Sequence, residues 1–250
     1  MARVEVLGCP IDAVTMAEAV ERVGQAVRSR ETCQHVAINA AKLVKFQRDP
    51  ALREAVLGCE LVTADGQAVV WAARLLQQRL PERVAGIDLM NELLTEAALR
   101  GHRVFLLGAR PDVVARAEAA ILQRLPELQI VGRYHGYFAP DREEAVVEEI
   151  VLAKPDLLFV ALETPAKELF LARNRLRLSI PFIMGVGGAF DVLAGVRRRA
   201  PVPFRKLGLE WLYRLAQDPR RLLRRYVVGN SQFIWLVACA VARRQQSRAG

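Results

Sequence analysis

The residues best suited to chemistry lie between Gly185 and Tyr226, where a glycine turn precedes a run of arginines. The turn reads GVGGAFD from Gly185 to Asp191 and follows an apolar strand. Glycines there let backbone N–H groups approach a phosphate at the start of a helix. Phe190 stands where the dinucleotide fingerprint has its third glycine, and no Gly-Lys-Ser/Thr of a Walker A loop follows. The turn indicates a phosphate or nucleotide ligand other than NAD or a P-loop ATP, with a tight structural turn as the alternative.

The arginines beyond this turn are interleaved with apolar side chains. The basic residues are Arg214, Arg221, Arg224 and Arg225, and the apolar residues beside them are Trp211, Leu212, Leu215, Leu222 and Leu223. Asp218-Pro219 is expected to break this helical region in two. Tryptophan and leucine beside arginine favour an interfacial segment on an anionic lipid surface. Nucleic acid is the competing ligand, although no recognised binding module appears, and an oligomer interface is the structural alternative.

Two further residues are candidates for the reaction itself. Asp65, in TADGQ, follows an apolar strand and could act as a general base if partly buried. Its alternative role is to cap the helix that starts near Gln67, and spacing alone favours the cap. Arg83, in PERVAGIDL, lies in a loop before a helix, where it could meet a diphosphate; an exposed surface arginine is the default interpretation.

Histidine and cysteine offer no catalytic or metal-binding pattern. His35, His102 and His135 lack ligand spacing and acidic neighbours, so no metal site is predicted. The cysteines, Cys9, Cys33, Cys59 and Cys239, form no CxxC pair and sit in apolar surroundings. Reduced, buried thiols are expected, which favours a cytosolic compartment.

The composition fits one large domain, or one domain with an appendage. The chain has 250 residues, of which 52% are hydrophobic and 25% charged, so it can bury a full core. Its formal charge of +9 at pH 7 comes mainly from arginine, which suits phosphate and carboxylate partners. The N-terminal sequence lacks a signal-peptide pattern, and no apolar run reaches the roughly 18 residues needed to span a bilayer.

Apolar strands alternate with amphipathic helices along the chain. Strands are expected at residues 4–7, 35–38, 61–63, 103–107, 128–131, 156–161 and 182–186, with a capped helix from Thr15 and further helices starting near Pro50, Asp88, Pro111 and Asp141. This alternation predicts an α/β fold with a Rossmann-like parallel sheet covered by helices on both faces. The Pro-rich segment Arg199–Phe204 suggests a boundary, which predicts an α/β catalytic domain over 1–195 and a basic, helical, membrane-associating appendage over 196–250.

Polar and glycine residues follow several of these strands. Asn39, Asp65, Gly108 and Gly187 each stand at the carboxyl end of an expected strand. Ligands bind at that edge of open α/β sheets. Each residue alone could be a turn former, but together they favour a site.

These residues also carry a resemblance to a known family. The chain resembles the WecG/TagA/CpsF glycosyltransferases, bacterial enzymes that extend lipid-linked precursors of surface polysaccharides. The resemblance runs nearly end to end, through Ile38-Asn39, Ala64–Gly66, Arg83–Leu89, Phe105–Gly108 and Gly136–Phe138. Its most specific part is GVGGAFDVLAG, followed by RRAP and LEWLYRL…P.R..RY.

The resemblance implies an inverting, metal-independent and cofactor-free transfer from a UDP-sugar to an undecaprenyl-diphosphate-linked sugar. The transferred sugar would be of the N-acetylmannosamine, glucose or uronic-acid type. Asp65 matches the proposed general base. The substrate-binding positions implied are Asn39, Arg83, Gly108, Tyr137, Lys167, Gly185, Gly187, Gly188 and Asp191. Arg214, Arg221 and Arg224 match an appendage thought to hold phosphate at the membrane. The enzyme would then be peripheral on the inner face of the bacterial plasma membrane.

The chain departs from the family pattern in the expected pocket. Ala37 replaces a common threonine, and Glu163, Ala166 and Lys167 replace the glycine, lysine and glutamine of the usual GxPKQE segment. A lysine there could pair with an acidic sugar or a diphosphate, so a retained enzyme with changed specificity is the hypothesis. A non-catalytic UDP-sugar-binding membrane protein is one alternative, and a basic nucleic-acid-binding protein is another, although no nucleic-acid partner is expected. A homo-oligomer is also left open.

Overall fold

The computed structural model describes residues 2–206 and 208–249, without the side chains of residues 206, 221, 222, 224, 225 and 247–249. The strands are β1 Arg3–Val6, β2 Cys9–Asp12, β3 Cys33–Ile38, β4 Leu61–Ala64, β5 Arg103–Gly108, β6 Gln129–Tyr134, β7 Leu157–Ala161 and β8 Phe182–Gly185. The helices are α1 Met16–Ser29, α2 Ala40–Phe46, α3 Pro50–Leu57, α4 Gln67–Leu75, α5 Gly86–Arg100, α6 Pro111–Arg124, the 3-10 turn η1 Pro140–Arg142, α7 Glu143–Ala153, α8 Ala166–Leu178, α9 Ala189–Leu193, α10 Val202–Lys206, α11 Glu210–Gln217 and α12 Pro219–Ala249.

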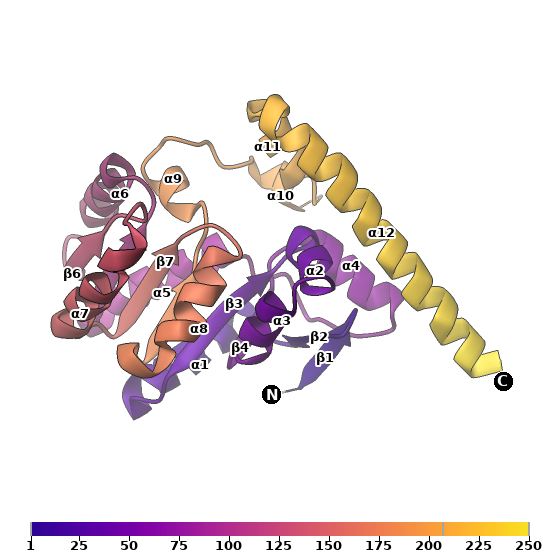
Figure 1. The fold of residues 1–250 in the computed structure, drawn as a ribbon, viewed down its shortest axis with the longest axis horizontal. Helices are drawn as coiled ribbons and strands as arrows, with labels where there is room; N and C mark the ends of the chain where they lie inside the picture. The colour runs from indigo at the N-terminus through magenta and orange to yellow at the C-terminus, as the bar shows by residue number, and fades with distance from the viewer. Residues whose placement is uncertain (1, 207, 250) are drawn as a thin grey trace.

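A six-stranded parallel sheet with the order β4-β3-β8-β7-β5-β6 forms the centre of the molecule (Figure 1). Helices cover both of its faces, so the predicted α/β class and parallel sheet are confirmed. Strand residues alternate between the faces: Leu157 and Phe159 of β7 pack with α1, α5, α6 and α9, whereas Leu158 and Val160 pack with α7 and α8.

Local sequence signals account for several element boundaries. Thr15 and Glu18 form the predicted capping box of α1. Pro50 and Pro111 stand in the first turns of α3 and α6, where the missing N–H of proline does no harm. The expected strands near residues 4–7, 35–38 and 61–63 correspond to β1, β3 and β4, with shifted ends.

A small hairpin, β1 with β2, covers the β4 edge of the sheet and was not foreseen in full. Its second strand reads CPID, and proline is uncommon inside strands. Asp12 of that strand is buried, pairs with Arg3 at 2.8 Å and accepts a hydrogen bond from Val62 N–H of β4 at 2.7 Å. The hairpin thus gives the outer strand of the sheet a polar partner.

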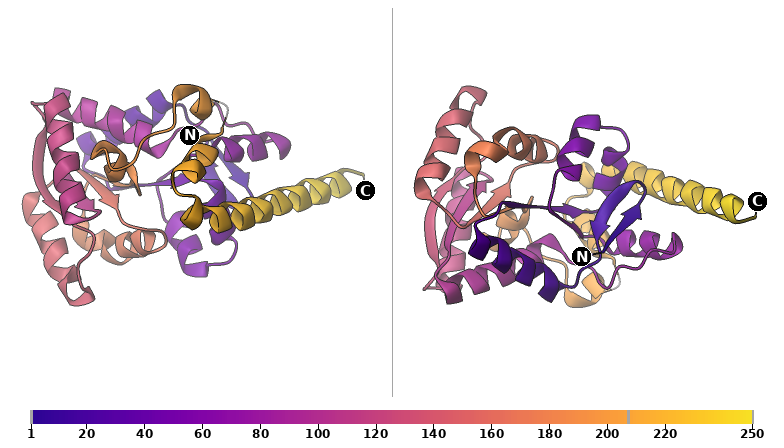
Figure 2. Two further views of the ribbon diagram at one scale, coloured as in Figure 1. Left: turned by 90° about the horizontal axis from the view of Figure 1, so that it is seen from above. Right: turned by 90° about the horizontal axis from the view of Figure 1, so that it is seen from below.

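The C-terminal helices lie against the β3–β4 end of the body. Asp218-Pro219 separates α11 from α12, as predicted. Phe233 and Val237 of α12 are buried in the cluster formed by α2, α3 and α4, and the end of α12 projects beyond the body in both views of Figure 2. No described helix is both long and apolar enough to cross a membrane. The domain boundary near residue 195 remains a prediction.

Candidate active site

The predicted site residues converge at the carboxyl edge of the sheet. Asn39 follows β3, Asp65 follows β4 and Gly187 follows β8, and these strands are neighbours in the order β4-β3-β8. The carboxyl ends of neighbouring parallel strands lie at one edge of the sheet, so residues that follow these strands lie close together. One half of this edge, which we call the charged half, contains Asp65, Arg83, Lys167 and Glu210.

Asp65 is half-buried and oriented by the backbone of another segment. Gly86 N–H donates to Asp65 Oδ1 at 2.9 Å, and Asp65 N–H donates to Ile38 O at 2.8 Å. Helix α4 does start at Gln67, but its N-cap is Gly66, with no side-chain cap. The capping role that spacing favoured for Asp65 is therefore wrong, because the carboxylate turns toward the start of α5.

Asn39 caps a different helix, α2. Its Oδ1 accepts a hydrogen bond from Lys42 N–H at 2.9 Å and opens the short helix α2. Lys42 itself is buried, and its Nζ lies 2.7 Å from Glu168 Oε1. Neither α2 nor Lys42 was predicted, because a seven-residue helix carries little periodicity.

Lys167 lies in the same buried group. Its Nζ is 3.5 Å from Glu168 Oε1, and Thr164 Oγ1 donates to the same oxygen at 3.2 Å. Burial and Lys42 lower the pKa of Lys167 to about 8, although Glu168 and Asp65 act in the opposite direction. A Cβ at Gly185 would overlap Lys167 Cε, so this glycine makes room for the lysine.

Arg83 is not the exposed arginine that the default interpretation expects, because only 15% of its side chain is accessible. Its guanidinium lies 3.4 Å from Glu210 and 3.9 Å from Asp88. Asp88 also contacts Arg199 at 2.6 Å and Arg205 at 3.8 Å. Two segments distant in sequence, residues 83–88 and 199–210, thus meet through ion pairs.

Glu210 also binds Arg214, one of the appendage arginines expected from the sequence. Arg214 Nη2 donates to Glu210 Oε1 at 2.6 Å. Burial lowers the pKa of Arg214, but the charges of Glu210 and Asp65 outweigh it and raise this pKa. Burial raises the pKa of Glu210, but the arginines Arg214, Arg83 and Arg199 outweigh burial and lower this pKa. We call the six side chains the arginine cluster: Arg83, Asp88, Arg199, Arg205, Glu210 and Arg214. The side chains of Arg221 and Arg224 lie outside the described part of the chain.

The other half of the edge, which we call the glycine half, contains Gly108, Gly136 and Tyr137. Gly108 has a φ of +122°, and a Cβ there would stand 2.6 Å from the backbone of Ala161. A Cβ at Gly136 would stand 2.6 Å from the Leu162 side chain and 3.0 Å from the backbone of Gly108. Tyr137 is 72% exposed. Among the described residues, no hydrogen bond or ion pair joins these three to Asp65 or to the arginine cluster.

The turn after β8 lies between the two halves. Gly187 takes a φ of +52°, and Gly188 is the N-cap of α9. Asp191 stands in the first turn of that helix, and its backbone O accepts from Arg197 N–H at 3.0 Å. The predicted strand, glycine turn and helix are therefore present.

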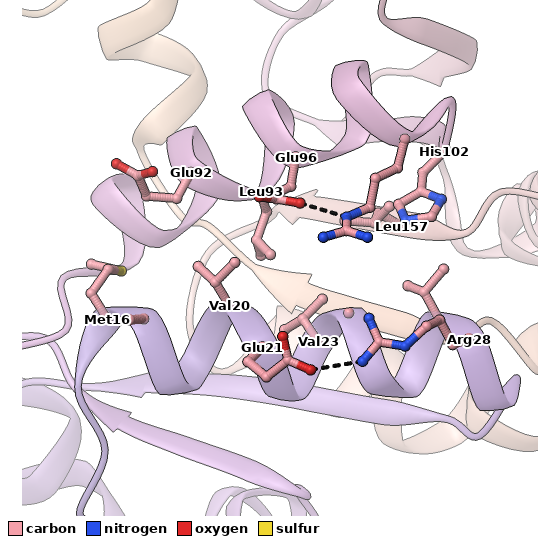
Figure 3. A pocket seen from close by; sticks show the side chains of 14 residues that line it. Met16, Val20, Glu21, Val23, Arg28, Glu92, Leu93, Glu96, His102 and Leu157 are labelled. Atoms are coloured by element: carbon pink, nitrogen blue, oxygen red, sulfur yellow. Dashed lines mark hydrogen bonds and ion pairs between the residues drawn. The ribbon is translucent and has the colours of Figure 1, made fainter.

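A cavity lies on the opposite side of the sheet from the candidate site. It holds about 410 Å³ between α1 and α5 (Figure 3) and is lined by the ion pairs Glu21–Arg28 and Glu96–Arg100. His102 and Leu157 in its wall stand at the amino ends of β5 and β7, opposite the edge with Asp65. It is separate from the candidate site.

The thiols and histidines play no part in the site's contacts. All the cysteines are free; Cys9, Cys33 and Cys59 are buried, and Cys239 is half-buried. His35 is buried, with Nε2 2.9 Å from Thr63 Oγ1, and burial lowers its pKa to about 3. Among the described residues, no group of three or more His, Cys, Asp or Glu side chains is arranged to hold a metal ion.

The carboxyl edge of this parallel sheet, the edge where open α/β enzymes bind their ligands, carries an oriented carboxylate and clustered arginines, an arrangement suited to anionic groups. The glycosyl transferase WecG/TagA/CpsF family model matches residues 4–248, and the chain belongs to this family of glycosyltransferases.

Curated relatives cover almost the whole chain. An N-acetylglucosaminyldiphosphoundecaprenol N-acetyl-beta-D-mannosaminyltransferase of Staphylococcus aureus strain MW2 is 34% identical over 250 residues, which span 99% of this chain and 96% of the relative. The protein of the same name from strain NCTC 8325 / PS 47 matches with the same identity and coverage. The family resemblance inferred from the motifs is confirmed.

Proposed function

We propose that this enzyme transfers a sugar from a UDP-sugar to an undecaprenyl-diphosphate-linked sugar, with inversion at the anomeric carbon, during synthesis of a cell-surface polysaccharide. The observation that carries the proposal is the placement of Asp65. Its carboxylate is fixed by Gly86 N–H at the sheet edge, beside the arginine cluster. The names of the relatives support a lipid-diphosphate acceptor.

In this reaction Asp65 removes the proton of the acceptor hydroxyl as its oxygen attacks the anomeric carbon of the donor. The bond between that carbon and the diphosphate oxygen breaks from the opposite side, and UDP leaves with the bonding electrons. Negative charge therefore grows on the diphosphate. Arginines held in place before the reaction stabilise such charge without reorganisation, so the proposed transfer needs no metal.

The donor is proposed to lie along the sheet edge. Two strands, β8 and β7, separate β3 from β5, which puts the ends of β3 and β5 about 14 Å apart at ordinary strand spacing. This span suits an extended nucleotide sugar. Its sugar would lie in the charged half near Asp65, Asn39 and Lys167. Its nucleoside would lie toward Gly187, Gly188, Asp191, Gly108 and Tyr137.

The proposed place of action is the inner face of the plasma membrane. The appendage exposes several large apolar side chains among its described residues: Trp211, Leu212, Leu223, Val227, Val228, Ile234 and Trp235. Such side chains beside arginines favour an anionic lipid surface. Co-sedimentation with phosphatidylglycerol vesicles tests this: Trp235→Ser should weaken binding, whereas Leu176→Ser, at the exposed Leu176 on α8, should not. Absence of wild-type binding would contradict the membrane assignment, and equal binding by all three proteins would contradict the role of the surface that contains Trp235.

The function is tested by incubating the enzyme with a panel of UDP-sugars and a short-chain polyprenyl-diphospho-N-acetylglucosamine. Mass spectrometry should detect a lipid-linked disaccharide, and NMR should show an anomeric configuration opposite to that of the donor. Product formation should persist in EDTA. Asp65→Asn should lose the product, whereas Asp141→Asn, at the exposed Asp141, should keep it. Absence of transfer with every donor would contradict the proposed function.

A further inference from the structure

The arginine cluster contains more positive charge than its own acids neutralise. It brings together four guanidinium groups and two carboxylates. Asp88 is shared by Arg83, Arg199 and Arg205, and Glu210 is shared by Arg83 and Arg214. Like charges at this spacing repel one another, so the group retains a net attraction for a further anion.

Two of its donors are also buried without a protein partner. Nε of Arg199 and Nε of Arg205 are inaccessible to solvent and make no hydrogen bond in the structure. Buried N–H groups are almost always paired in folded proteins, and an unpaired one marks a strained or ligand-binding position. Guanidinium groups present N–H donors in a fork that matches phosphate oxygens.

The cluster lies beside the proposed general base. Asp65 accepts from Gly86 N–H at the start of α5, and Asp88 stands in the first turn of the same helix. The charge of Asp65 also acts on Arg214. An anion held by the cluster would therefore lie next to the reacting groups.

We propose that Arg199 and Arg205 join Arg83 and Arg214 in binding a diphosphate diester, with Asp88 and Glu210 holding the guanidinium groups in position. This inference rests on the proposed function for the identity of the ligand. A diphosphate diester is a dianion, which matches the excess charge of four arginines over two acids. Two substrates of the proposed reaction have this chemistry: the nucleotide-sugar and the lipid-linked acceptor.

The first experiment measures binding without catalysis. Isothermal titration calorimetry compares UDP with UMP for the wild type, Arg199→Gln and Arg205→Gln. If the nucleotide is the ligand, each substitution should weaken UDP binding by roughly tenfold or more, the loss expected for a charged hydrogen bond. UMP binding should change much less.

The second experiment measures steady-state transfer. If the lipid diphosphate is the ligand, UDP binding is unchanged and the KM for a short-chain polyprenyl-diphospho-N-acetylglucosamine rises by roughly tenfold or more instead. The two arms thus distinguish the two sources. Arg198→Gln is the matched control, because Arg198 is an exposed neighbour with the same charge; it should change either value less than about twofold.

Arg199→Lys separates loss of binding from loss of folding. Lysine keeps the positive charge near Asp88 but lacks the Nε–H and the planar guanidinium. It should fold and still lose affinity. The proposal is overturned if folded Arg199 and Arg205 variants match Arg198→Gln in both arms. Failure of the wild type to transfer any sugar would instead contradict the proposed function. Calorimetric titration with UDP and with the short-chain polyprenyl-diphospho-N-acetylglucosamine would still test the cluster, and equal affinities of wild type and variants for both ligands would overturn it.

Discussion

The charged half and the glycine half occupy the same edge of one sheet, yet their residues work differently. Asp65, Arg83 and Glu210 are held by hydrogen bonds and ion pairs from distant segments. Gly108 and Gly136 instead allow backbones to approach closely, where any side chain would collide. A polar or glycine residue that follows a strand can therefore have either of two roles. In the charged half such a residue supplies a charged group to the site, and in the glycine half it lets neighbouring segments pack closely.

The largest effect is expected at Asp65. Asp65→Asn keeps the size of the side chain but removes the base, so kcat should fall by roughly 10²–10⁴-fold. The free energy of unfolding should change little by comparison. Stopped assays of transfer measure kcat, and thermal melting compares the stability of the variant with that of the wild type. A folded variant with near wild-type kcat would show that Asp65 is not the general base.

In the glycine half, the largest effect should be on stability. Gly108→Ala introduces a Cβ 2.6 Å from Ala161 at a φ of +122°. Unfolding free energy should fall by about 3 kcal/mol. Urea denaturation measures this, with Gly24→Ala in α1 as the control, where the added Cβ meets only the end of the flexible Arg28 side chain. A Gly108→Ala variant as stable as the control would contradict the close-packing role.

Lys167 should make stability depend on pH. Its pKa is lowered from 10.5 to about 8, so the unfolded chain binds more protons than the folded one between these values. Wild-type unfolding free energy should therefore rise across that window, relative to Lys167→Gln, by up to about 3 kcal/mol. Urea denaturation at about pH 7, 8, 9 and 10 checks the sign of this change in unfolding free energy. A constant difference between the two proteins would be the contrary result.

The same variant tests specificity. If Lys167 recognises an acidic sugar or a diphosphate, Lys167→Gln should change the preference among UDP-sugars. Competition between donors in one reaction reads this out directly. Unchanged preference and unchanged rate would mean that the lysine in place of the family's usual glutamine does not set specificity.

The smallest effect is expected at Tyr137. Its side chain is exposed, as a stacking surface for a base would be. Tyr137→Ala should raise the KM for the UDP-sugar by about tenfold, the loss of one stacking contact, and leave kcat unchanged. Tyr137→Phe keeps the ring and should resemble the wild type. If both variants behave alike, the nucleoside does not lie on this ring.

Much of the fold was predictable because local patterns and packing agree. Continuous apolar strands such as Leu157–Ala161 are typical of a buried parallel sheet. The hairpin strand with Pro10 and the short helix after Asn39 were not foreseen, because neither carries a clear period. Helix α8 was also not foreseen, since its start at Ala166 lies within a segment treated as a motif.

Site residues were predictable only where a local sequence motif marks the individual residue. Asp65 and Arg83 follow recognisable strand and loop patterns, but sequence spacing assigned Asp65 to a helix cap. The arginine cluster was missed because it depends on tertiary contacts, such as the pair between Asp88 and Arg199, 111 residues apart. Local sequence does not report which of several consecutive arginines turns inward.

The decisive measurement is a crystal structure with a bound UDP-sugar. We expect the anomeric carbon of the sugar in the charged half, beside Asp65, and the uracil over the glycine half, near Gly108 and Tyr137. A donor bound in the reverse orientation, or in the cavity between α1 and α5, would contradict it.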